Sequence, residues 1–93
     1  MKKSEELKHV LEKVISHLSE SDESDWSPLT PTEVINKLQN QIDMINNNHS
    51  INKDLLRLEF APTSTIQEIA MANGWSDEFL ELSAKFDKLI SWF

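Results

Sequence analysis

Four carboxylates lie close together between Glu20 and Asp25, in the segment ESDESD, and form the densest group of potential ligands in the chain. A calcium-binding EF-hand loop needs ligands at alternating positions, a glycine at the sixth position and a bidentate Glu at the twelfth. This segment contains no glycine, and Pro28 and Pro31 restrict the backbone that follows it. We therefore expect a solvated acidic loop, with no metal site.

The three histidines, His9, His17 and His49, are the other candidate metal ligands. No two of them are four residues apart, the spacing that places two imidazoles on one face of a helix. The chain has no Cys, no glycine-rich phosphate loop and no nucleophile elbow. We expect no enzyme activity, and hence no catalytic residue, cofactor or metal.

Ala70 and Gly74 have the spacing at which helix-turn-helix proteins place Ala in the first helix and Gly in the turn. A recognition helix presents its first residues to DNA bases between two rows of phosphates. In this chain those positions hold Asp77, Glu78 and Glu81, which phosphates would repel. We expect a packed corner of two helices and no direct binding of nucleic acid.

The formal net charge of the chain is -7, and the excess negative charge is unevenly distributed. The segments Glu20–Asp25 and Leu58–Ala84 carry four and five acidic residues, and all nine Lys and Arg residues lie outside them. This pattern predicts an acidic face that recognises a basic protein by electrostatic attraction. The alternative is that the negative charge only improves solubility.

The residues expected to contact such a partner come from these two segments and their border: Asp22, Glu23, Asp25, Trp26, Glu68, Asp77, Glu78 and Glu81. Trp26 is included because an aromatic side chain beside four acids is typical of the centre of an interface. The other interpretation of Trp26 is burial against the first helix.

The chain has 93 residues, so we expect a single domain over 1–93. Hydrophobic residues make up 39% of it and charged residues 27%, and one Gly leaves little chance for tight hairpin turns. We predict an all-α fold, a compact bundle of about five helices. With no signal-peptide core and no long apolar run, we expect a cytoplasmic protein without membrane contact.

Apolar residues at helical spacing place the five helices. The expected ranges are Ser4–Ser19, Pro31–Asn46, Ile51 or Asn52 to Phe60, Thr65–Asn73, and Ser76 to the C-terminus, with a loop over Glu20–Leu29. The side chains expected to cap helices are Ser4, Thr30, Thr65 and Ser76. Two of these caps have a Glu three residues later and predict capping boxes, Thr30 with Glu33 and Thr65 with Glu68.

The remaining signals concern helix ends and the core. Pro62 forbids continuation of the third helix, and Asn73-Gly74 is a usual end for the fourth. Trp75 is spaced to pack on Leu80 as a hydrophobic staple. The residues predicted to be buried are Leu11, Val14, Leu38, Ile42, Ile69, Phe79 and Phe86.

Residues Trp26 to Phe93 resemble a group of small acidic bacterial proteins that includes the immunity proteins of contact-dependent growth inhibition systems. The similarity is concentrated in the FAPT segment Phe60–Thr63, the NGW turn Asn73–Trp75 and the EFLEL segment Glu78–Leu82. The resemblance implies that the chain binds and neutralises a cognate toxin domain, often a nuclease, and blocks substrate access. It assigns no individual functional residue.

Two other functions remain open from the sequence. One is a small helical regulatory protein that uses the helix-turn-helix-like corner at Gly74. The other is a helical adaptor that dimerises through exposed apolar residues such as Trp92 and Phe93.

Overall fold

The computed structural model describes residues 2–21, 30–61 and 64–93. Within these ranges the chain forms five α-helices and no strand: α1 (Lys3–Ser19), α2 (Pro31–Asn46), α3 (Lys53–Glu59), α4 (Thr65–Asn73) and α5 (Ser76–Ile90). The prediction of an all-α bundle of about five helices is confirmed. None of the helices described combines the length and the apolar character that crossing a membrane requires.

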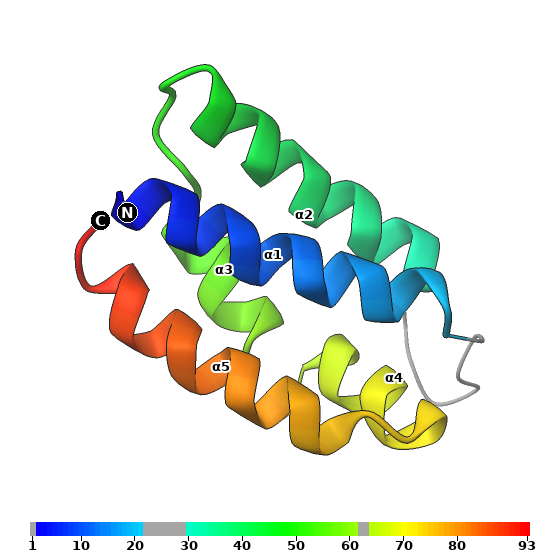
Figure 1. The fold of residues 1–93 in the computed structure, drawn as a ribbon. Coiled ribbons are helices and arrows are strands. Elements are labelled where there is room, and N and C mark those ends of the chain that lie inside the picture. Colours follow the sequence, from blue (N-terminus) through cyan, green and yellow to red (C-terminus); the bar gives the residue numbers. More distant parts are fainter. Residues whose placement is uncertain (1, 22–29, 62–63) are drawn as a thin grey trace.

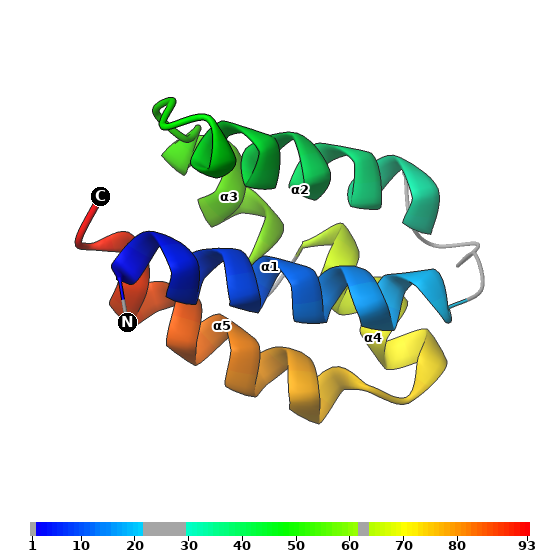
Figure 2. The ribbon, with the colours of Figure 1, turned by 45° about the horizontal axis from the view of Figure 1, so that its top comes forward.

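Helix α1 lies at the centre, between α2 and α5 (Figure 1). Both neighbours run antiparallel to α1 (Figure 1). The short helices α3 and α4 lie behind α1 in the view of Figure 2. The two ends of the chain lie at the same end of the bundle, where the Lys3 ammonium is 5.1 Å from the centroid of the Trp92 ring. The bundle measures 36 × 22 × 21 Å.

The core consists of the apolar stripes that the helical spacing predicts. All seven residues predicted to be buried are at most 3% exposed. The ring of Phe60, the residue after α3, stacks on two rings of α5 within this core, with its centroid 4.3 Å from that of Phe86 and 5.9 Å from that of Phe79. Offset stacking of this kind adds about 0.5–1.5 kcal/mol per pair beyond burial. Together, these contacts hold α3 against α5.

Two of the predicted helix ends are confirmed in detail. Thr30 caps α2, with its Oγ1 accepting from the Glu33 backbone N–H at 3.2 Å and the Glu33 carboxylate accepting from the Thr30 N–H in return. Helix α4 ends at Gly74, which adopts the left-handed conformation with φ of 79°. Helix α3 ends at Glu59, one residue before its predicted end, and Pro62 lies outside the described residues.

Helices α1 and α5 begin differently from the prediction. Ser4 is not the cap of α1, because the helix already starts at Lys3 and Lys2 precedes it without a side-chain cap. Ser76 is not the cap of α5 either, since it is already the first helical residue and Trp75 occupies the cap position. In both helices the polar residue lies inside the first turn, where its backbone is helical and cannot act as a cap.

The predicted cap of α4 is also displaced by one residue. Ser64 precedes the helix, and its Oγ accepts from the backbone N–H of Gln67 at 3.2 Å. Thr65 is the first helical residue, so the predicted capping box between Thr65 and Glu68 does not form. Two adjacent hydroxyl residues offer the same side-chain acceptor, and the direction in which the chain enters the helix selects between them.

Polar contacts join α3 to α2. The buried Gln41 accepts from the Asn52 backbone N–H at 2.7 Å, and Lys37 Nζ lies 3.7 Å from a carboxylate oxygen of Glu59. Burial raises the pKa of the Glu59 carboxyl above its ordinary value, and the nearby Lys37 charge opposes this shift. Glu59 is therefore a structural ion-pair partner and is not available to the acidic face.

Candidate functional site

Three of the predicted contact residues lie together at the start of α5. Asp77 and Glu78 occupy the first turn, Glu81 follows one turn later, and all three side chains are exposed. Residues three and four apart share a helix face, so Glu81 lies beside both of the others. The helix dipole favours the two carboxylates of the first turn, whereas Glu81 repels both of them. We call these three residues the acidic helix end.

An exposed apolar side chain lies beside the acidic helix end. Leu80 is 54% exposed and is three residues from Asp77 and four from Ala84, so these side chains share one face of α5. The predicted staple between Trp75 and Leu80 is wrong. Trp75 is itself the cap residue, so the fourth helical position is Phe79, and the Trp75 ring meets it edge-on at 6.2 Å between centroids.

Leu80 also forms part of a groove between α3 and α5. Ala84 and Leu80 lie on the α5 side of this groove, which has a volume of about 390 Å³, and Phe60 and Phe79 contribute core rings to it. Leu58 on α3 is exposed as well. The groove also includes Arg57 and Asp87, so Leu80 is an exposed apolar side chain with charged groups at its border, a combination found in many protein interfaces.

Trp75 holds the acidic helix end in place. Its indole is only 6% exposed and stacks on the His17 ring at 4.8 Å between centroids. The indole N–H donates to Ser21 Oγ at 2.8 Å, and the Ser21 hydroxyl donates to the His17 carbonyl at 2.8 Å. The start of α5 is thus joined to the end of α1, and Trp75 is a structural residue.

The other predicted contact residues are not brought to this surface by the described structure. Glu68 lies in the first turn of α4 and is half-buried, with one carboxylate oxygen enclosed and without a hydrogen bond among the described residues. Four further predicted contact residues lie outside the described residues, and their role stays a prediction: Asp22, Glu23, Asp25 and Trp26. The described acidic helix end therefore comprises residues of α5 alone.

The candidate metal ligands of the described residues are dispersed. No group of three or more His, Cys, Asp or Glu side chains is arranged to hold a metal ion within 2–21, 30–61 and 64–93. His9 is exposed, as its position off the apolar stripe predicts, and His17 is half-buried against Trp75. The exposed side chains at the start of α5 offer negative charge and one apolar contact.

Sequence reasoning missed Leu80 as a surface residue. The signal was present, because Leu80 falls between the core positions Phe79 and Leu82 and not on the i, i+3, i+4 stripe that they form with Phe86.

Comparisons of this chain with protein families, curated proteins and solved structures give no match.

Proposed function

We propose that this chain is an immunity protein or antitoxin that binds a basic toxin domain, a nuclease, and neutralises it by blocking access of the substrate. The observation that carries the proposal is the acidic helix end, Asp77, Glu78 and Glu81, with the exposed Leu80 beside Asp77. No ion pair joins these three carboxylates to another described residue.

The chemistry of a nuclease explains why such a surface would inhibit it. A nuclease must attract a phosphate backbone, and it does so with Lys and Arg side chains around its cleft. Carboxylates presented on a rigid helix can occupy the same positions as the phosphates. Leu80 would add an apolar contact that slows dissociation, since affinity differences within one interface lie mostly in the dissociation rate.

The two alternative functions fit the described surface less well. The corner of α4 and α5 resembles a helix-turn-helix, but its second helix exposes Asp77, Glu78 and Glu81 where DNA phosphates would lie. Of the two residues considered for dimerisation, Trp92 is 69% exposed, whereas Phe93 packs partly against the core. A single exposed ring is a small surface for a stable dimer.

The proposal predicts a toxin reading frame immediately upstream of this gene, and the test uses the toxin domain that it encodes. The purified domain should bind the chain and lose its nuclease activity, with an association rate that falls steeply as salt increases. Replacing Asp77, Glu78 and Glu81 together by Lys should slow association by at least about tenfold and leave circular dichroism unchanged. Leu80→Ala should act mainly on the dissociation rate.

A matched control separates local from overall charge. Replacing the exposed Glu5, Glu12 and Asp43 by Lys changes the net charge equally but leaves the acidic helix end intact. This variant should keep an association rate within a few-fold of the original, because screening limits distant charges to a range of about 10 Å. An isolated gene, or an upstream toxin domain that is neither bound nor inhibited, would contradict the proposal.

A further inference from the structure

A second groove, of opposite charge, lies between α1 and α5. It has a volume of about 420 Å³ and is lined by Lys3 and Lys13 from α1 and by Lys85 and Lys88 from α5. Four of the nine Lys and Arg residues of a chain with a net charge of -7 are therefore gathered at one groove. Within the described residues Glu6 is the single acidic side chain that lines it.

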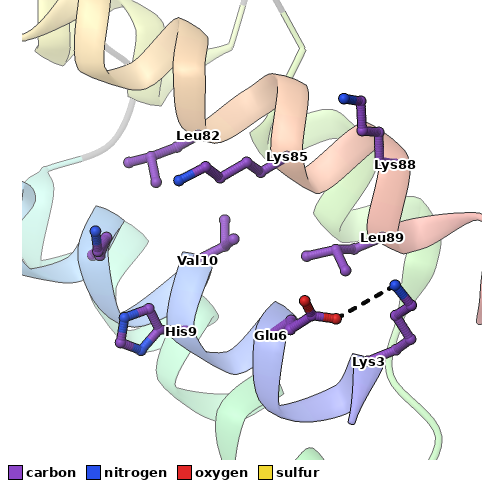
Figure 3. A pocket seen from close by; sticks show the side chains of 9 residues that line it. Lys3, Glu6, His9, Val10, Leu82, Lys85, Lys88 and Leu89 are labelled. Carbon is purple, nitrogen blue, oxygen red and sulfur yellow. Dashed lines mark ion pairs between the residues drawn. The ribbon is translucent and has the colours of Figure 1, made fainter. Parts of the chain in front are cut away.

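Most of this positive charge is not neutralised within the described part of the chain. Lys3 lies 3.5 Å from Glu6, in the ion pair at one end of the groove in Figure 3. No ion pair joins Lys13, Lys85 or Lys88 to another described residue. Like charges that converge without partners repel one another, so an anionic ligand would relieve this repulsion.

The floor of the groove is apolar. Val10 contributes to it from α1, and Leu82 and Leu89 contribute from α5. Lys85 lies along the groove between Leu82 and Val10, whereas Lys88 extends away from the floor (Figure 3). A ligand that matches this groove needs an apolar group for the floor and negative charges for its sides.

The spacing of the lysines indicates the size of the ligand. Lys3 and Lys13 are ten residues apart on one helix, which places their backbones about 15 Å apart. A fatty acid or an inorganic anion carries its charge at one point and would meet cations at one end only. An extended peptide of about five residues covers 15 Å and can carry a carboxylate at each end of an apolar side chain.

We propose that the groove between α1 and α5 binds an acidic peptide segment of a partner protein, with an apolar side chain on the floor and carboxylates beside the lysines. A nucleic acid strand would also meet the lysines, but it would place a charged phosphate or the polar edge of a base on this aliphatic floor, where a Leu or Phe side chain buries no polar atom. The site is separate from the acidic helix end and does not depend on the toxin-binding proposal.

The experiment measures fluorescence anisotropy of labelled peptides at low salt. The panel consists of peptides with nine Glu and one Leu or Phe at varied positions, an all-Glu nonapeptide of equal charge, and a single-stranded thymidine decamer. We expect at least one apolar-containing acidic peptide to bind more tightly than the all-Glu peptide and the oligonucleotide. The variant Lys85→Glu with Lys88→Glu should weaken this binding by at least about tenfold.

The matched control changes two basic residues of α3. Lys53→Glu with Arg57→Glu produces the same change in net charge outside the groove, and its peptide affinity should stay within a few-fold of the original. Circular dichroism of both variants must show an unchanged helix content. Absence of binding by every peptide, equal binding by the all-Glu peptide, tighter binding of the oligonucleotide, or equal loss in both variants would each overturn the proposal.

Discussion

The Trp75 side chain joins two helices through three separate contacts, and its replacement by Ala should destabilise the fold strongly. The indole is 6% exposed, stacks on His17, meets Phe79 edge-on and donates to Ser21. Removing a buried Trp costs about 3–5 kcal/mol in the free energy of unfolding. A domain of this size has a total stability of only about 5–15 kcal/mol, so the loss is a large fraction of it.

The assay is urea denaturation followed by far-ultraviolet circular dichroism, which does not depend on the removed fluorophore. Trp75→Phe keeps an aromatic ring but loses the donor to Ser21, and should cost less than Trp75→Ala. Trp92→Ala is the matched control, because this Trp is 69% exposed and its contact is with the Lys3 ammonium. It should cost less than about 1 kcal/mol. Equal losses for Trp75→Ala and Trp92→Ala would refute the assigned role of Trp75.

Three further predictions concern helix ends and one buried charge. Thr30→Ala should lower the free energy of unfolding by about 1 kcal/mol in urea denaturation, because it removes the α2 cap, whereas Thr30→Ser should not. Gly74→Ala should cost about 1–2 kcal/mol in the same assay, and Gly74→Asn less, because φ is 79° and no atom lies within 4 Å of an added Cβ. Glu59 has a raised pKa in the folded state, so the fold binds its proton more tightly than the unfolded chain does. The tighter binding of this proton stabilises the fold at pH values below the ordinary pKa of Glu, and the stabilisation is lost as pH rises through the raised pKa. Glu59→Gln should therefore remove the fall in the free energy of unfolding over that pH window. A loss of stability on lowering the pH through the same window, traced to Glu59, would contradict this sign.

The sequence by itself determined the helices and their buried faces, because both depend on residues within one or two turns of each other. The stripes of apolar residues three and four apart identified all seven predicted core positions. The Thr30–Glu33 box and the stop at Gly74 are contacts between neighbours in the chain, so local chemistry suffices to predict them. The three carboxylates of the acidic helix end share one surface for the same reason, since they lie on consecutive turns of α5.

The tertiary structure alone decided which surfaces these helices form together. Local signals placed three caps one residue or more from their true positions, because the direction of the chain outside a helix selects among adjacent polar residues. Trp75 turned toward His17 and Ser21, more than 50 residues away in the sequence, in place of the predicted contact with Leu80. The basic groove exists only because α5 packs antiparallel beside α1 and brings Lys85 and Lys88 next to Lys3 and Lys13. No periodicity within either helix carries that information, since the pairing of distant helices depends on how all of the apolar faces fit together in one core.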